Sequence, residues 1–140
     1  MKRVFLDTNV FIDYVAHRDL FYAPAATIVS LADQGAYDLM VSPLSFATAS
    51  YVLEIHHGMS PEMIVEGFRQ FASLCRIITV DESVIRSAIS NPFCDFEDAI
   101  QFHTAMANEA DCIITRNKKD FTTTSILILK PQEFLDMLAI

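Results

Sequence analysis

Residues 3–9 read RVFLDTN, and residues 110–117 read ADCIITRN. In both segments a short apolar run ends in polar residues, with Asp7 after the first run and Arg116 and Asn117 after the second. Continuous apolar runs of this length are typical of strands that are buried on both faces of a parallel sheet. In such sheets the ligand site lies beyond the carboxyl ends of the strands, which is where these polar residues are expected.

The rest of the chain alternates further strand-like and helix-like segments. Alternation of this kind predicts an α/β fold, a three-layer α/β/α domain with a central parallel sheet of about five strands. No linker or internal repeat interrupts the 140 residues, so we expect a single domain over 1–140. The other expected strands are 37–41, 76–80 and 126–129, and the expected helices are 21–34, 43–55, 60–74, 81–89, 95–108 and one from Pro131.

The charge balance limits the class of function. The net charge of −8, from 10 basic and 18 acidic residues, argues against a protein that coats DNA, because phosphate binding needs a positive surface. An acidic site that collects divalent cations still approaches phosphates, because the metal reverses the local field. Nucleic acid therefore remains an acceptable substrate.

Targeting signals and cysteine pairs are not evident. The apolar runs are far shorter than the ~20 residues of a membrane helix, and no signal-peptide pattern follows Met1, so we expect a cytoplasmic protein without a membrane partner. The three cysteines, Cys75, Cys94 and Cys112, stand singly in apolar contexts. We expect buried reduced thiols there, rather than a disulfide or a zinc site.

The stretch FCDFEDAIQFHTA, residues 93–105, brings three acids to the start of an otherwise apolar helix. Asp95 and Asp98 are spaced i, i+3, which leaves them about 60° apart on one helix face. Asp95 taken alone is also explained as a helix N-cap. Glu97 falls on another face, where we expect it to be solvated. Asp98 borders core-facing residues, where a carboxylate needs a cation.

Two further acids are expected at the same edge of the sheet. Asp7 follows the first strand and Asp120 follows the fourth, while the helix that carries Asp95 and Asp98 leads into the fourth strand. Carboxylates and phosphate oxygens are the ligands that Mg²⁺ and Mn²⁺ prefer. The sequence does not offer a set of zinc ligands, because no histidine lies at ligand spacing from a cysteine. We expect surface or helix-face positions for the histidines, which are His17, His56, His57 and His103.

Three motifs, taken in order, resemble the PIN domain, the nuclease fold of the VapC-type toxins. They are Asp7-Thr8-Asn9, the segment DFEDA at 95–99 and the segment TRNKKDF at 115–121, and the likeness extends to PQEFL at 131–135. The resemblance implies an endoribonuclease that depends on Mg²⁺ or Mn²⁺ and cleaves single-stranded RNA. It also implies the toxin of a toxin–antitoxin pair, with a small antitoxin as partner and a homodimeric assembly.

The resemblance also implies roles for individual residues. The catalytic acids are Asp7, Asp95, Asp98 and Asp120, and the metal ligands among them are Asp7, Asp98 and Asp120. Hydroxyl and amide side chains that orient these ligands are Asn9, Thr115 and Asn117. From their position at the rim, and not from the resemblance, we expect contacts to the RNA backbone from Arg116, Lys118 and Lys119; the alternative is a solvated loop after the strand.

The sequence departs from the family pattern at two positions. Many PIN nucleases carry a glutamate where Thr48 stands, and Glu54 lies on a different helix face. Asn117 stands where other members place an acid. These departures keep open an alternative function, a catalytically weak or inactive PIN-fold interaction module. A receiver-like phosphoacceptor is a third interpretation, but the third expected strand is followed only by Asp81.

Overall fold

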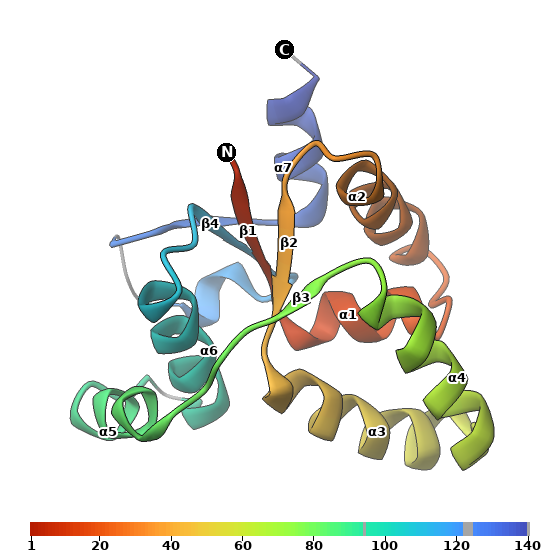
Figure 1. Ribbon diagram of the computed structural model, residues 1–140, viewed down its shortest axis with the longest axis horizontal. Helices are drawn as coiled ribbons and strands as arrows, with labels where there is room; N and C mark the ends of the chain where they lie inside the picture. The colour runs from red at the N-terminus through yellow and green to blue at the C-terminus, as the bar shows by residue number, and fades with distance from the viewer. Residues whose placement is uncertain (94, 122–124, 140) are drawn as a thin grey trace.

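The computed structural model of the chain describes residues 1–93, 95–121 and 125–139, which form a three-layer α/β/α fold (Figure 1). The strands are β1 (Arg3–Leu6), β2 (Asp38–Val41), β3 (Arg76–Ile77), β4 (Cys112–Ile114) and β5 (Leu127–Leu129). The helices are α1 (Thr8–Val15), α2 (Tyr22–Asp33), α3 (Pro43–His57), α4 (Pro61–Ala72), α5 (Glu82–Ser90), α6 (Phe96–Ala107) and α7 (Pro131–Leu138), with a short 3-10 helix η1 (Lys118–Asp120).

The five strands form one sheet in the order β3-β2-β1-β4-β5, and every pairing is parallel. The central strand β1 pairs with β2 on one side and with β4 on the other, so that Phe5 lies beside both Met40 and Ile113. The chain builds outward from β1 to β3 and then crosses back to β4. The strand order therefore reverses between β1 and β4, the place where open parallel sheets bind ligands. The predicted fold is confirmed.

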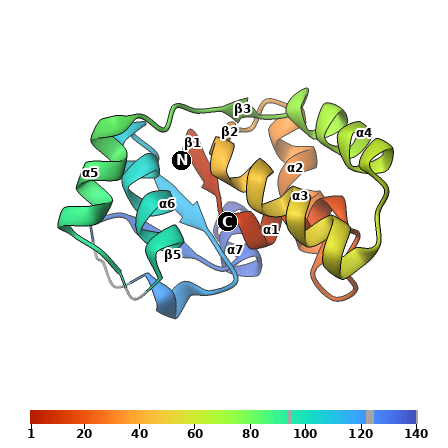
Figure 2. The same ribbon diagram turned by 90° about the horizontal axis from the view of Figure 1, so that it is seen from below.

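Strand side chains alternate between two cores, one on each face of the sheet. Val4 and Leu6 face a core that is shared with α1, α2, α3, α4 and α7. Phe5 faces the other core, which contains Phe102 and Ala105 of α6. Figure 2 shows α5 and α6 together on one side of the sheet and the other helices opposite. Because both faces are covered, the central parts of β1, β2 and β4 are buried and apolar, while the edge strand β3 is exposed.

Aromatic side chains pack helix α1 against α3 and α4. The ring of Phe11 lies 4.4 Å from that of Phe71, centroid to centroid, and 4.9 Å from that of Phe46. Offset-stacked and edge-on pairs of this kind contribute about 0.5–1.5 kcal/mol each beyond their buried area. The packing holds the start of α1, and with it Asp7 and Asn9, at the end of β1.

The structure differs from the sequence-based expectations at several elements. Helix α1 was not predicted, and β3 covers only Arg76–Ile77 of the expected strand 76–80. Cys75 is half-buried and Cys112 buried, both as free thiols, while Cys94 lies outside the described residues. Within the described ranges, no helix is long and apolar enough to cross a membrane.

Candidate functional site

Asp7 lies at the point where the strand order reverses. Its backbone N–H donates to Ile114 O of β4 at 2.9 Å, which continues the sheet by one residue. Its buried carboxylate accepts hydrogen bonds from the Thr115 hydroxyl at 2.8 Å and the Thr8 backbone N–H at 2.8 Å. Burial raises the pKa of Asp7, and these two hydrogen bonds oppose the increase. A carboxylate at this position is costly to ionise without a cation nearby.

Gln101 of α6 donates a hydrogen bond to Asp7. Sequence analysis did not single out this residue. Its fully buried carboxamide donates to Asp7 Oδ1 at 3.3 Å, and to the hydroxyls of Thr8 and Ser45 at 3.0 Å each. Its oxygen accepts from the Ser42 hydroxyl at 2.7 Å. This buried network ties α6 and α3 to the end of β1. The spacing of Gln101 three residues after Asp98 places both on one helix face, which is the signal that could have revealed it.

A cavity of about 270 Å³ opens above Asp7, and we call it the acidic pocket. It brings together the four predicted acids, which come from three separate places in the chain: the end of β1, the start of α6 and η1. The carboxylates in its lining are Asp7, Asp95, Glu97, Asp98 and Asp120, and the other lining residues are Thr8, Asn9, Ile12, Arg18, Thr48, Val52 and Asn117.

Burial and the neighbouring carboxylates both act on Asp98. Its pKa is raised to about 7, first by desolvation and then by the charges of Asp7, Asp95, Asp120 and Glu97. The cation in the lining, Arg18, is engaged by the buried carboxylate of Asp13 at 3.2 Å. The pocket thus concentrates negative charge that its own side chains do not neutralise.

The predicted orienting residues differ in how directly they contact Asp7. Thr115 donates to the carboxylate, and Asn9 Nδ2 lies 3.4 Å from Asp7 Oδ2 and 3.3 Å from the Thr115 hydroxyl oxygen. Asn117 acts on this group through its backbone, because its N–H donates to Thr115 Oγ1 at 3.1 Å. Its side chain lines the acidic pocket.

The three predicted RNA-contacting residues do not line the acidic pocket. Arg116 pairs with Asp13, with 2.6 Å between Nε and Oδ2, and Lys118 pairs with Glu133 at 3.2 Å. Lys119 is exposed on η1. Their contact with RNA stays a prediction.

The donor set of the acidic pocket suits a hard divalent cation in kind. All five acids offer oxygen, and each histidine lies outside the lining. As the side chains stand, no three Asp, Glu, His or Cys residues in the described part of the chain converge closely enough to hold an ion. The raised pKa of Asp98 is the observation that favours a cation, since a positive charge would relieve the repulsion.

Comparison with known families gives a match over most of the chain, because a model of the PIN domain matches residues 3–119. The chain belongs to the PIN domain family. No curated protein matches the sequence closely enough to count as a relative.

Solved structures similar to this PIN domain include three from bacteria. The structure titled VapBC2 from Rickettsia felis, bound to a promoter DNA fragment, has a TM-score of 0.66 at 18% identity and covers 91% of this chain and 97% of that one. VapC20 from Mycobacterium tuberculosis, a Sarcin–Ricin loop cleaving toxin, gives 0.62 at 14% identity, with 79% and 86% covered. FitAcB from Neisseria gonorrhoeae gives 0.61 at 20%, with 92% and 98% covered. At these identities the likeness concerns the fold.

In this PIN domain Glu97 is not the solvated residue that sequence analysis expected. It is half-buried in the acidic pocket, and desolvation raises its pKa, as do the charges of Asp7 and Asp95. Hydrogen bonds from the hydroxyls of Thr48 and Thr8 oppose the increase. Glu97 thus meets Thr48, the residue that stands where many PIN nucleases carry a glutamate. Glu54, by contrast, is exposed and does not line the pocket.

Proposed function

We propose that this PIN domain is a metal-dependent endoribonuclease that cleaves phosphodiester bonds of RNA. The observation that carries the proposal is the acidic pocket, where five carboxylates line one cavity at the end of β1 and the pKa of Asp98 is raised to about 7. Such a pocket repels nucleic acid unless a cation occupies it, and a hard divalent cation both neutralises the acids and attracts a phosphate.

Asp7, Asp98 and Asp120 are the residues that would hold Mg²⁺ or Mn²⁺, with Asp95 as the fourth catalytic acid. When bound, such a cation supplies Lewis acidity toward a phosphate and lowers the pKa of a water molecule. Thr115 and Gln101 keep the Asp7 carboxylate in one orientation through their hydrogen bonds. Partners of this kind fix the geometry of the ligand, as outer groups do in metal sites generally.

RNA, a small antitoxin and a second copy of the chain are the partners we propose. VapC20, which has a similar fold, is a Sarcin–Ricin loop cleaving toxin, and this favours RNA as the substrate and a toxin as the role. The similar VapBC2 and FitAB structures are bound to DNA fragments. From the likeness to VapC20, we propose that the chain acts as the toxin of a toxin–antitoxin pair.

A second candidate is a PIN-fold interaction module with little or no catalysis. Two observations favour it: Thr48 occupies a position where many PIN nucleases have an acid, and the described acids do not converge on one point. Calorimetric titration with Mn²⁺ separates the two candidates, because a nuclease binds the ion in the acidic pocket and an inert module does not.

Cleavage of a short single-stranded RNA tests the nuclease. We expect cleavage with Mg²⁺ or Mn²⁺, none with EDTA, and a rate at least ~100-fold lower for Asp98→Asn. The melting temperature of D98N should equal or exceed that of the wild type, because the substitution removes repulsion. Glu54→Gln, which removes an exposed acid of α3 outside the pocket, is the matched control and should cleave normally. Equal rates for D98N and the wild type would rule out this site.

A further inference from the structure

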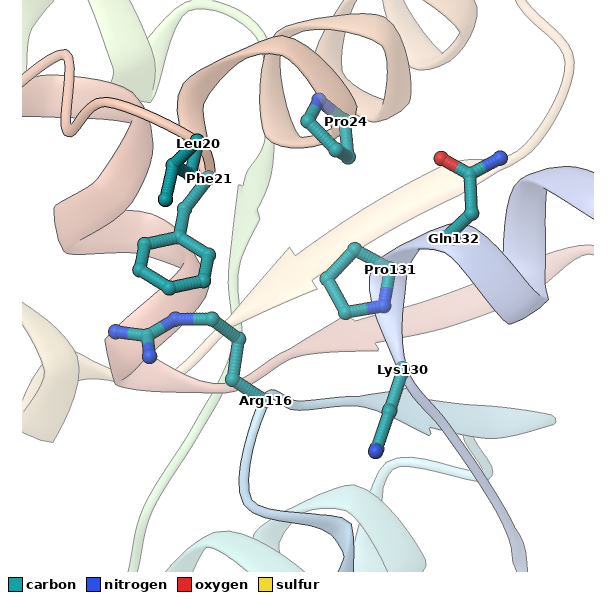
Figure 3. Close-up of a pocket in the computed structure, with 7 residues that line it drawn as sticks. All are labelled: Leu20, Phe21, Pro24, Arg116, Lys130, Pro131 and Gln132. Atoms are coloured by element: carbon teal, nitrogen blue, oxygen red, sulfur yellow. The ribbon is translucent and has the colours of Figure 1, made fainter.

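A second cavity, of about 430 Å³, lies between the first turns of α2 and α7, and we call it the Phe21 pocket (Figure 3). Its apolar walls include Leu20, Phe21 and Pro131. Figure 3 shows the Phe21 ring and the Arg116 side chain on one side, with Pro131 and Gln132 across from them. The volume falls within the range of small-molecule sites.

Leu20 holds an unfavourable conformation at the mouth of this pocket. Its backbone φ is +72°, a left-handed conformation that residues other than glycine rarely adopt, and its side chain is 91% exposed. The next residue, Phe21, is 40% exposed. Backbone strain combined with exposed apolar side chains is typical of segments that bind a ligand.

Arg116 gives the pocket a positive wall. Its guanidinium lies 4.1 Å from the centroid of the Phe21 ring, a cation–π contact. Both Arg116 and Arg18 pair with the single buried carboxylate of Asp13, at 2.6 Å and 3.2 Å. Asp13 is shared between the two arginines and so does not fully offset Arg116, which is one of the two cations in the lining of the Phe21 pocket, with Lys130 as the other.

Two polar side chains complete the lining. Lys130 is exposed, and among the ion pairs of the described residues none involves it. The carboxamide of Gln132 donates one hydrogen bond to Asp136 at 3.0 Å, which leaves its oxygen and a second N–H available. An aromatic ring, cations and a free amide are the groups that bind a nucleotide: the ring stacks on a base, the cations attract a phosphate and the amide contacts the base edge.

The Phe21 pocket is connected to the acidic pocket through Arg116. The Arg116 backbone N–H donates to Asn9 Oδ1 at 3.2 Å, and Asn9 Nδ2 in turn contacts Asp7 Oδ2 at 3.4 Å. The two pockets therefore have neighbouring linings, which the hydrogen bond between Arg116 and Asn9 joins.

We propose that the Phe21 pocket binds a flanking nucleotide of the same RNA strand that the acidic pocket cleaves, with the base against Phe21 and the phosphate toward Arg116 and Lys130. The inference rests on the proposed ribonuclease function. It adds a nucleobase subsite that is separate from the acids and that positions the strand.

Binding of a labelled, cleavage-resistant single-stranded RNA hexamer with phosphorothioate linkages, measured by fluorescence anisotropy in Mg²⁺, tests the subsite without cleavage and with a cation available to the acidic pocket. We expect Phe21→Leu to weaken binding about ten-fold, because it removes the aromatic face, and Phe21→Tyr to bind as the wild type does. Lys130→Gln should lessen the salt dependence by about one phosphate contact. Ile89→Ala, which alters an exposed apolar residue of α5 outside the pocket, is the control and should have no effect.

A hexamer with abasic positions separates base recognition from phosphate recognition. We expect it to bind equally to the wild type and to F21L, because the base that stacks on Phe21 is missing. Equal binding of the intact hexamer to the wild type and F21L overturns the inference, even if RNA is cleaved; the pocket would then suit another occupant, such as a peptide of the antitoxin. Conversely, Phe21-dependent binding by a protein that cleaves nothing would support the subsite and contradict the nuclease.

Discussion

Glu97 lies beside Thr48 in the acidic pocket, next to the position where many PIN nucleases carry a glutamate. Sequence analysis assigned it to a solvated face, because its angular position on α6 differs from that of Asp98. The structure places it in the acidic pocket beside Thr48, where its pKa is raised by burial. In the first turn of a helix, a long side chain reaches past the helix end, and angular position alone does not predict its contacts.

We therefore expect Glu97 to contribute to cation binding where Thr48 does not. Glu97→Gln should weaken Mn²⁺ binding about ten-fold, a loss within the range found for groups next to a metal site. Isothermal titration calorimetry measures the affinity, and the exposed acid of Glu54→Gln is the control. If E97Q binds Mn²⁺ with the affinity of the wild type, Glu97 does not contribute to cation binding.

The raised pKa of Asp98 predicts how stability depends on pH in the absence of metal. The pKa of Asp98 is raised to about 7 in the folded state, whereas in the unfolded chain the carboxyl has its ordinary pKa of about 3.9. The folded state then binds more protons than the unfolded state between these values, so stability falls as pH rises through this window. Asp7, Asp95, Glu97 and Asp120 face the group and add to the effect, while Arg18 lies in the same lining.

Asp98→Asn should remove this part of the pH dependence. In EDTA we expect the wild type to lose more stability than D98N between pH 5 and pH 8, and Mn²⁺ at pH 8 to stabilise the wild type more than the variant. Thermal unfolding by circular dichroism measures both effects. Parallel pH profiles for the two proteins would show that Asp98 ionises normally.

At the scale of elements, local signals predicted most of the helices and missed one. Helices α3, α4 and α5 are preceded by the N-cap residues Ser42, Ser60 and Asp81, whose side chains accept a hydrogen bond from the first turn of each helix. Helix α1 was missed because its eight residues include β-branched side chains, which favour strands, and because its cap is Asp7, an acid explained by the site. Tertiary packing by Phe11 outweighs that propensity. The edge strand β3 is shorter than expected. Its pairing with β2 extends over only two residues.

Asp95 combines two roles that substitution can separate. It is the N-cap of α6, and its side chain accepts a hydrogen bond from the Asp98 N–H at 3.2 Å, while it also lines the acidic pocket. Asp95→Ser keeps a capping oxygen and removes the charge, whereas Asp95→Ala removes both. We expect D95A to lose about 1 kcal/mol of unfolding free energy and D95S to lose much less.

Both variants should weaken Mn²⁺ binding to a similar degree if Asp95 acts in the pocket. Urea denaturation gives the stabilities, and calorimetry gives the affinities. Weakened binding in D95A alone would mean that Asp95 acts only by capping the helix.

For the whole molecule, topology explains why the acids could be predicted and their neighbours could not. Parallel strands bring their carboxyl ends to one edge, so Asp7 and Asp120 were expected together from the order of strands alone. The direction of Arg116 toward Asp13 and Phe21 depends on the loop before α2, where Leu20 has a positive φ that no local pattern indicates. Likewise, the contacts of Gln101 with Ser42 and Ser45 join α6 to α3 across the fold.

Self-association belongs to the same scale, and helix α3 offers a surface for it. Tyr51 and Ile55 lie one turn apart on α3 and are 62% and 56% exposed, which is unusual for large apolar side chains. The resemblance described under sequence analysis implies a homodimer. If α3 forms it, Tyr51→Glu combined with Ile55→Glu should yield a monomer, because two buried carboxylates would face the partner. Met137→Glu, a similar change to an exposed residue of α7, is the control, and light scattering after size exclusion gives the mass. A wild-type protein that is monomeric at tens of micromolar, or a double variant that stays dimeric, would show that α3 is not the interface.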